Sequence, residues 1–216
     1  MKIKICGMRD PANIAAVAAL KPAYLGFIFY PQSKRFVGNL SASVLDALPA
    51  SIIKTGVFVN EQLHQVQEFV LKYKLQAVQL HGDECPNYCK ALKTLFPGIS
   101  LIKAFGLKEG FDFATLIPYQ KVVDYFLFDT QTPDHGGSGK TFNWAILKEY
   151  TLNVPFFLSG GIGPEHVVEL QQLSHPNLYG IDVNSRFETE PALKDTDKLK
   201  AFKTKLFPLS TVANGI

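Results

Sequence analysis

A cysteine and an aspartate each end a run of apolar residues, and they are the first candidates for chemistry. Cys6 ends the run Lys2–Cys6, and Asp129 ends the run Tyr125–Asp129. A thiol with a lowered pKa becomes a reactive thiolate, although most free cysteines are simply small buried apolar residues. A carboxylate at the end of a buried strand is costly unless it is paired, hydrated or used in catalysis. Both residues are therefore candidates for a catalytic site, with packing as the alternative for Cys6 and helix capping or loop anchoring for Asp129.

Two further segments place polar side chains directly after apolar runs. Lys34 and Arg35 are neighbours in the loop 30–36, where they could hold an anion. Arginine can bind a carboxylate through two parallel hydrogen bonds, but such a pair is also ordinary in a solvated loop. His81 follows Leu80 and could orient or polarise a substrate, although a lone histidine is more often a structural donor. Metal binding by His81 is not expected, because no second ligand stands at a suitable spacing.

The loops after the last two apolar runs predict a phosphate site. Glycine lets backbone N–H groups approach a ligand closely, and a helix N-terminus attracts an anion. Barrels built from alternating strands and helices frequently hold phosphate between the loops after strands seven and eight. The two loops are Leu158–Pro164 and Asp182–Arg186.

The segment Gly136–Thr141 is also rich in glycine and ends in Gly-Lys-Thr, like the phosphate-binding loop of many nucleotide hydrolases. That motif requires glycine at position 134, where this chain has Asp134. We therefore predict a mobile loop that closes over a substrate rather than a nucleotide site.

The candidate residues stand at the ends of runs that have the length of strands. The runs are nearly continuously apolar, as expected of strands that are buried on both faces. Helical patterns between them predict parallel strands with right-handed crossovers. Eight such units match a compact α/β fold, a single (β/α)8 TIM barrel. We expect the barrel to cover residues 1–208 and a tail to cover 209–216. A doubly wound open sheet is the alternative. The runs are Lys2–Cys6, Tyr24–Phe29, Ile53–Val59, Ala77–Leu80, Leu101–Ala104, Tyr125–Asp129, Pro155–Leu158 and Leu178–Val183.

Helix starts are predicted from capping residues. Asp10 followed by proline, Ser41 and Asn60 each precede an apolar pattern of helical period, and Gly163 followed by proline precedes another. The fifth helix, near Phe111–Ile117, is expected to be weak or short because a glycine and a proline flank it closely.

The composition excludes several classes of protein. The chain has 216 residues, 47% hydrophobic and 19% charged, which is typical of a folded domain. Its net charge of +3 comes without a run of basic residues, so we expect a small anionic substrate rather than nucleic acid. The sequence has no stretch of about eighteen apolar residues, so it predicts no membrane span. The three cysteines form no Cys-x-x-Cys pair, so we expect free thiols and a cytoplasmic location.

Short segments at most of the strand ends match one known family. They are Lys4–Met8, Gly26–Phe29, Ser33–Val37, Gly56–Asn60, Val78–Gly82, Phe128–Thr130, Gly137–Trp144, Ser159–Ile162 and Gly180–Ser185. The combination of Lys4–Gly7 with Gln79–Gly82 is the most specific part. On these segments the chain resembles the phosphoribosylanthranilate isomerases, the (β/α)8 enzymes of tryptophan biosynthesis.

The resemblance implies a reaction and roles for individual residues. The family converts N-(5-phospho-β-D-ribosyl)anthranilate to 1-(2-carboxyphenylamino)-1-deoxy-D-ribulose 5-phosphate by an Amadori rearrangement, with no metal or organic cofactor. By matching position, Asp129 would be the general acid and Cys6 the general base. Arg35 would hold the anthranilate carboxylate, and His81 and Asp182 would orient the rest of the substrate. The phosphate would be held by the two loops at Gly160, Gly161, Asn184 and Ser185.

One departure from the family concerns the phosphate loop. The family usually has Ser-Ser-Gly after the eighth strand, where this chain has Asn184, Ser185 and Arg186. Arg186 could add a cation to the phosphate site or point away into solvent.

Other activities stay open as alternatives. A related isomerase of histidine biosynthesis would place carboxylates at the ends of strands one and five, but this chain has Cys6 and Lys103–Phe105 there. Indole-glycerol-phosphate synthase would need catalytic lysines that the early strands do not supply. A non-catalytic barrel that only binds a sugar phosphate would lack the acid or the base. The expected partner is a phosphorylated small molecule. The protein is expected to be a monomer or a homodimer, and in a homodimer a second copy of the chain is also a partner.

Overall fold

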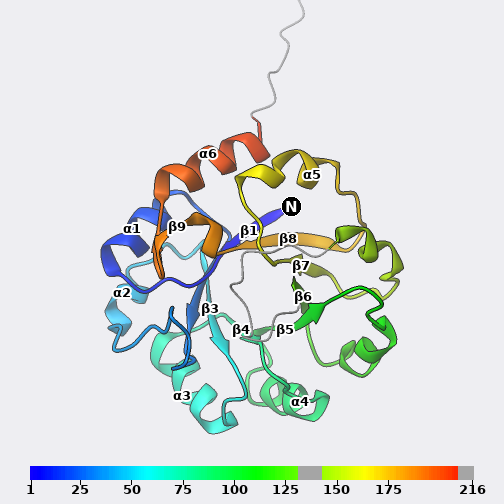
Figure 1. Ribbon diagram of the computed structural model, residues 1–216. Coiled ribbons are helices and arrows are strands. Elements are labelled where there is room, and N and C mark those ends of the chain that lie inside the picture. The colour runs from blue at the N-terminus through cyan, green and yellow to red at the C-terminus, as the bar shows by residue number, and fades with distance from the viewer. Residues whose placement is uncertain (131–142, 209–216) are drawn as a thin grey trace, which may run out of the picture.

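The computed structural model describes residues 1–130 and 143–208, and in these residues eight parallel strands form a closed barrel surrounded by helices (Figure 1). Each strand pairs with the next along the chain, and the first pairs with the last. The open sheet is therefore excluded and the predicted (β/α)8 barrel is confirmed. The strands are β1 (Lys2–Ile5), β2 (Tyr24–Ile28), β3 (Ile53–Phe58), β4 (Ala77–Leu80), β5 (Ser100–Leu107), β6 (Tyr125–Thr130), β7 (Phe156–Leu158) and β8 (Leu178–Val183).

The strands coincide with the predicted apolar runs to within a residue or two, except for β5. That strand was expected to end at Ala104, but it continues to Leu107. Its last residues pair with the end of β6, where Gly106 lies opposite Asp129 and Leu107 opposite Thr130. Pairing with a neighbouring strand thus extends β5 beyond its apolar run.

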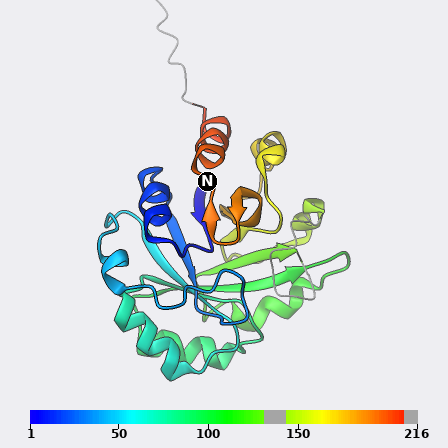
Figure 2. The ribbon, with the colours of Figure 1, turned by 60° about the vertical axis from the view of Figure 1, so that its left-hand side comes forward.

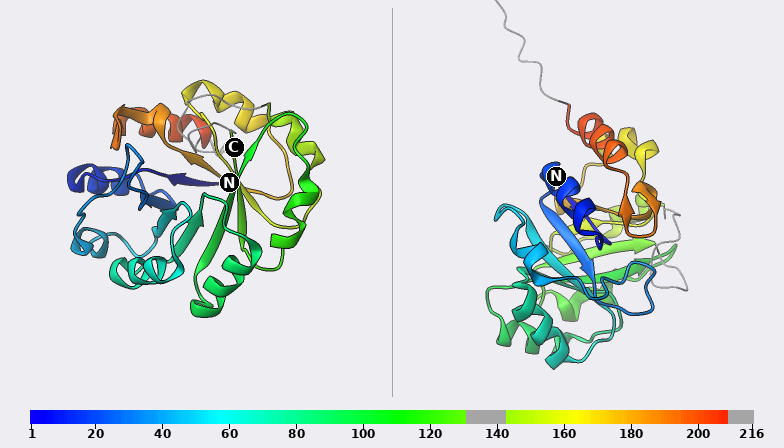
Figure 3. Two further views of the ribbon diagram at one scale, coloured as in Figure 1. Left: turned by 60° about the horizontal axis from the view of Figure 1, so that its bottom comes forward. Right: turned by 90° about the vertical axis from the view of Figure 1, so that its left-hand side faces the viewer.

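Helices and 3₁₀ helices alternate with the strands around the ring (Figure 3). α5 and α6 lie next to each other and complete the ring beside β8 (Figure 2). The elements are α1 (Pro11–Ala19), α2 (Ala42–Asp46), α3 (Leu63–Tyr73), α4 (Pro86–Leu95), η1 (Phe113–Tyr119), η2 (Trp144–Glu149), η3 (Pro164–His166), α5 (Val167–Gln172), η4 (Ser185–Phe187) and α6 (Thr196–Leu206).

Most of the predicted helix starts are confirmed. Asp10 caps α1 by accepting a hydrogen bond from the Asn13 N–H, and Ser41 caps α2. Asn60 was the wrong cap for α3, because the cap position is Gln62. The Asn60 side chain instead accepts a hydrogen bond from the Asp83 N–H at 2.6 Å, and so joins the loops after β3 and β4. The weak fifth helix is confirmed as η1, a 3₁₀ helix that contains a proline.

The interior of the barrel changes from apolar to polar along the strands. Tyr24, Ile102, Ala104, Leu127 and Phe157 form a small apolar cluster of their own, separate from the large core that packs against the helices. Alternation along each strand turns these side chains inward. Closer to the carboxyl ends, polar side chains take their place. Lys4, Thr55, Gln79, Asp129 and Asp182 are all buried.

A two-stranded hairpin after β8 was not predicted. β9 (Glu188–Glu190) pairs antiparallel with β10 (Leu193–Lys194), and the hairpin lies beside α1 (Figure 1). The Asn13 side chain of α1 donates to the Lys194 carbonyl oxygen and accepts from the Lys194 N–H, both at 2.8 Å. These strands are too short to show a period in the sequence, but they carry two charged residues of the site described below.

Two predictions fall outside the described residues. They are the mobile glycine-rich loop Gly136–Thr141, which lies within 131–142, and the tail 209–216. Within the described residues, no helix has the length and apolar character needed to cross a membrane.

Replacing the cap of α1 should destabilise the fold measurably. Asp10→Ala removes the acceptor for the Asn13 N–H at 2.7 Å, and we expect the free energy of unfolding to fall by about 1 kcal/mol. Urea unfolding followed by circular dichroism measures the change. Asp10→Asn is the matched control, since asparagine caps equally well, and an equal loss in both variants would contradict the capping role.

Candidate active site

Cys6 lies at the carboxyl end of β1, between β2 and β8. Its N–H donates to the Val183 carbonyl oxygen at 3.0 Å, which ties it to the end of β8. Gly26 of β2 provides the space for the thiol, because a β-carbon at that position would lie 2.6 Å from Sγ. The residue is only 4% exposed, so the sulfur lies at the inner wall of the barrel and not on the surface.

A buried ion pair lies directly beneath the cysteine. Lys4 and Cys6 stand two residues apart on β1 and therefore share its inward face. The Lys4 ammonium donates to Asp182 Oδ1 of β8 at 3.0 Å, and both side chains are buried. Burial alone would lower the pKa of Lys4, but the charges of Asp182 and Cys6 outweigh it and raise that pKa. Lys4 is a charged site residue that sequence reasoning missed, although its place two residues before Cys6 in an apolar run was a usable signal.

The environment of Cys6 acts on the thiol in two directions. Burial raises the pKa of Cys6, and the neighbouring Asp182 carboxylate adds to the rise. The ammonium groups of Lys4 and Lys194 lower the same pKa but do not outweigh burial. The net direction is upward, because desolvating the thiolate costs more than the two ammonium groups return.

Asp129 and His81 meet across the ends of β6 and β4. His81 Nε2 lies 3.4 Å from Asp129 Oδ2, and the Gln79 amide nitrogen lies 2.7 Å from His81 Nδ1. The other carboxylate oxygen of Asp129 accepts a hydrogen bond from the Thr130 N–H at 2.8 Å. Sequence reasoning found Asp129 and His81 but missed Gln79, which stands two residues before His81 and shares its inward face.

Asp182 connects the two halves of the site. Burial raises the pKa of Asp182 against the opposing effect of Lys4, and the charge of Asp129 raises it further. The same Asp182 charge acts on the Cys6 thiol. The candidate base and the candidate acid thus each interact electrostatically with one buried carboxylate, at the same end of the barrel.

Arg35 lies beside Cys6, but a carboxylate of the chain itself already holds its guanidinium. Arg35 Nε donates to both oxygens of Glu188, at 2.8 and 3.0 Å, and Nη2 donates to Oε2 at 2.7 Å. A β-carbon at Gly7, the residue after Cys6, would lie 2.7 Å from Arg35 Cδ. Among the described residues Nη1 has no hydrogen-bond partner, so this edge of the guanidinium is the part that can receive another anion.

Glu188 and Lys194 of the hairpin complete this network of charges. Lys194 Nζ donates to Glu188 Oε1 and to Asn184 Oδ1, both at 2.6 Å. Burial alone would raise the pKa of Glu188, but the hydrogen bonds and charges of Arg35 and Lys194 hold that pKa below its usual range. Sequence reasoning missed both hairpin residues. It placed Asn184 in the phosphate site, and the structure ties the Asn184 side chain to Lys194.

The glycine pair after β7 lies against the end of β6. Gly160 has φ of +89°, and a β-carbon there would lie 2.6 Å from the Thr130 nitrogen and 3.0 Å from Asp129 Oδ1. A larger residue would therefore be strained and would also push the loop away from Asp129. Gly161 follows with φ of +63°. The predicted phosphate loop and the candidate acid are neighbours for this reason.

Arg186 extends toward the loop after β7. Its Nη2 lies 3.7 Å from Glu165 Oε1, and the two side chains are 48% and 51% exposed. An exposed pair at this distance contributes little to stability. Ser185 begins the short helix η4 beside it.

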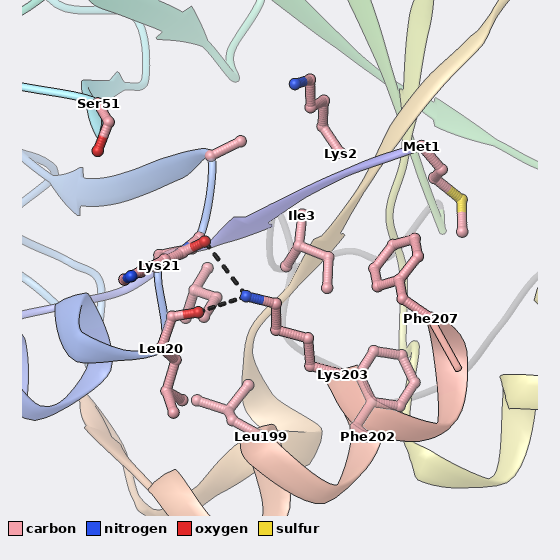
Figure 4. Close-up of a pocket in the computed structure, with 13 residues that line it drawn as sticks. Met1, Lys2, Ile3, Leu20, Lys21, Ser51, Leu199, Phe202, Lys203 and Phe207 are labelled. Atoms are coloured by element: carbon pink, nitrogen blue, oxygen red, sulfur yellow. Dashed lines mark hydrogen bonds between the residues drawn. The ribbon is translucent and has the colours of Figure 1, made fainter. Parts of the chain in front are cut away.

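A cavity of about 350 Å³ opens at the opposite end of the barrel, between β1, α1 and α6 (Figure 4). Lys203 crosses it and donates to the carbonyl oxygens of Leu20 and Lys21, at 2.5 and 3.3 Å. These carbonyls belong to the end of α1, so the ammonium stabilises a helix C-terminus. The cavity is lined in part by β1, the strand that leads to Cys6, but none of the catalytic candidates lines it. It is therefore separate from the candidate active site.

The chain matches known proteins over nearly its whole length. Residues 3–205 match a family model described as N-(5'-phosphoribosyl)anthranilate (PRA) isomerase. The enzyme of that name from Parabacteroides distasonis is 49% identical over 204 residues, covering 94% of this chain and 91% of the relative. The crystal structure of phosphoribosyl anthranilate isomerase from Thermus thermophilus aligns with a TM-score of 0.84 at 30% identity, covering 95% and 98% of the two chains. A crystal structure of an isomerase in complex with reduced 1-(o-carboxyphenylamino)-1-deoxyribulose 5-phosphate aligns with a TM-score of 0.77 at 28% identity, covering 95% and 98%.

The raised pKa of Cys6 predicts how its alkylation depends on pH. Only the thiolate reacts with iodoacetamide, so the rate should rise about tenfold for each pH unit and keep rising beyond pH 9.0, the ordinary value for a thiol. The measurement uses a Cys85→Ser, Cys89→Ala background, in which Cys6 is the remaining thiol, with a short free-cysteine peptide as the control. If the rate for Cys6 reached its plateau at a lower pH than the rate for the peptide, that result would contradict the raised pKa.

Proposed function

The chain belongs to the N-(5'-phosphoribosyl)anthranilate isomerase family, and we propose that it rearranges this substrate with Asp129 as the general acid and Cys6 as the general base. It is an isomerase of tryptophan biosynthesis, and its relatives act on a phosphorylated small molecule. The observation that carries the assignment of roles is the arrangement at the carboxyl end of the barrel. There a thiol beside a buried ammonium and a carboxyl beside a histidine interact with the same carboxylate, Asp182.

The first step opens the ribose ring. Asp129 donates a proton to the ring oxygen while the electron pair of the anilino nitrogen forms a double bond to C1. The C1–O bond breaks, which leaves an open-chain iminium ion and the Asp129 carboxylate. Hydrogen bonding from the Thr130 N–H at 2.8 Å and the nearby His81 ring support this carboxylate as it forms.

The second step moves a proton from C2. The Cys6 thiolate removes this proton, the C2–H electron pair forms a double bond between C1 and C2, and the iminium pair returns to nitrogen. The resulting enolamine tautomerises to the ketone: the C2 hydroxyl loses its proton as the C2=O bond forms, and C1 gains a proton, so the product is an isomer of the substrate. The buried thiol needs cations to ionise, and Lys4 and Lys194 supply them.

The two anionic ends of the substrate would fix the sugar between the acid and the base. In this proposal the anthranilate carboxylate binds the open edge of Arg35 beside Gly7. The phosphate binds the Gly160–Gly161 loop, where both glycines have positive φ, and the backbone at Asn184 and Ser185. Holding both ends converts the reaction into an intramolecular one with the reacting atoms already in place. No step requires a metal or an organic cofactor.

Turnover of the natural substrate tests the function directly. The full-length protein is mixed with freshly prepared phosphoribosylanthranilate, and the fluorescence of the anthranilate group is followed with time. An isomerase consumes the signal faster than spontaneous breakdown does. A barrel that only binds sugar phosphates would leave the decay unchanged, and that result would overturn the proposal.

Removing either the acid or the base should abolish most of the turnover. We expect Cys6→Ser and Asp129→Asn each to lower kcat by on the order of 10² to 10⁴, the usual contribution of a positioned general acid or base. Steady-state kinetics measures the loss, and circular dichroism shows whether each variant folds. Wild-type turnover in a folded variant would remove that residue from the mechanism, and Cys85→Ser, which changes an exposed thiol, is the control.

Arg35 should contribute to substrate affinity more than to the chemical step. Arg35→Ala removes a carboxylate contact that is present throughout the reaction, so we expect KM to rise by about tenfold or more with a smaller change in kcat. Glu188→Gln is the matched comparison, because it keeps the arginine and weakens the carboxylate that supports both Arg35 and Lys194. An unchanged KM in Arg35→Ala, with equal losses of stability in both variants, would make Arg35 purely structural.

A further inference from the structure

His81 lies between two polar side chains, and its two ring nitrogens meet different partners. Nδ1 lies 2.7 Å from the Gln79 amide nitrogen, and Nε2 lies 3.4 Å from Asp129 Oδ2. A neutral imidazole carries one proton, and the hydrogen bond at one nitrogen decides whether the other is a donor or an acceptor. The partner of Nδ1 therefore decides what His81 presents to Asp129.

Gln79 is held in a fixed position next to the ring. It stands on β4, two residues before His81, so both side chains point into the barrel. Its side chain is 1% exposed, which leaves little room for alternative positions. The amide can therefore act on His81 in one of two orientations only, with either its nitrogen or its oxygen toward the ring.

Hydrogen bonding favours the orientation with the nitrogen toward the ring. In this orientation the amide carbonyl oxygen is the atom without a partner among the described residues. The reverse orientation would place the amino group, with its two N–H donors, in that buried position. Unpaired buried N–H groups are rarer in proteins than unpaired carbonyl oxygens. The amide of Gln79 therefore donates to Nδ1.

We infer that Gln79 is a positioning residue, which holds neutral His81 as the tautomer with its proton on Nε2 and directs that N–H toward Asp129. The functional part of this inference rests on the proposed role of Asp129 as the acid. Once Asp129 has given up its proton, the Thr130 N–H on Oδ1 and the His81 N–H facing Oδ2 both stabilise the carboxylate. With the opposite tautomer, the lone pair of Nε2 would face the carboxylate and repel it.

Nuclear magnetic resonance reads the tautomer without reference to activity. The full-length protein is labelled with ¹⁵N-histidine, and long-range proton–nitrogen correlations show which ring nitrogen carries the proton. The signals of His81 are identified by their loss in His81→Asn. We expect the proton of the neutral ring on Nε2 in the wild-type protein, and a proton on Nδ1 instead would overturn the inference.

Two substitutions of similar size connect the tautomer to the reaction. Gln79→Glu replaces the donor by an acceptor, so Nδ1 should gain a proton. Gln79→Leu removes the hydrogen bond and leaves the tautomer unfixed. In both variants we expect kcat to fall by about tenfold or more while KM changes much less, because a wrong tautomer affects the chemical step. Gln76→Glu, which adds the same charge at an exposed position just before β4, should change neither the His81 signals nor kcat.

The outcomes separate this inference from the proposed function. A proton on Nδ1 in Gln79→Glu together with unchanged kcat would overturn the positioning role. The wild-type tautomer persisting in Gln79→Glu would overturn the claim that Gln79 decides it. A protein with the Nε2 proton but without isomerase activity would overturn the proposed function and support the tautomer assignment.

Discussion

The buried ion pair between Lys4 and Asp182 is the interaction on which the rest of the site depends. It joins β1 to β8, the pair of strands that closes the barrel, and the two residues are directly opposite each other in the register. Removing one partner would leave a buried charge uncompensated, at a cost of about 3–5 kcal/mol. The pair also brings a positive charge under Cys6 and a negative charge within range of Asp129. The same ion pair thus contributes both to the closure of the barrel and to the electrostatics of the site.

A second network of charges stands above the first, at the rim of the barrel. Arg35, Glu188, Lys194 and Asn184 form a continuous chain of hydrogen bonds from the loop after β2 to the hairpin after β8. Its positive members outnumber its one carboxylate, which suits a rim that receives a substrate with two anionic ends. In the proposed mechanism the lower pair would supply charge to the reacting groups, and the upper network would supply it to the ends of the ligand.

Glycine decides how closely these groups approach one another. Gly26 leaves the space that the Cys6 sulfur occupies, and Gly160 lets the loop after β7 lie against Asp129. A methyl group at position 26 would displace the Cys6 sulfur, and one at position 160 would displace the loop after β7 from Asp129. Because catalysis depends strongly on small displacements of the reacting groups, the absent side chains matter as much as the charged ones.

The amino-acid sequence by itself determined the strands, the barrel and the places where polar residues gather. Parallel strands buried on both faces must be apolar throughout, so their positions are visible as runs, and eight runs separated by helical patterns leave few architectures. Cys6 and Asp129 could be selected because each ends such a run, and His81 because it directly follows one, whereas Asp182 was selected only through the resemblance to the family.

Only the tertiary structure decided which of these polar groups meet. Lys4 and Asp182 are 178 positions apart, and Arg35 and Glu188 are 153 apart. No local pattern links residues at such separations, because their contact depends on the closure of the barrel and on a hairpin too short to show a period. For the same reason the sequence could not predict the direction in which the pKa of Cys6 shifts, because that shift balances burial against two cations from different elements. It also could not predict that the Asn184 side chain binds Lys194.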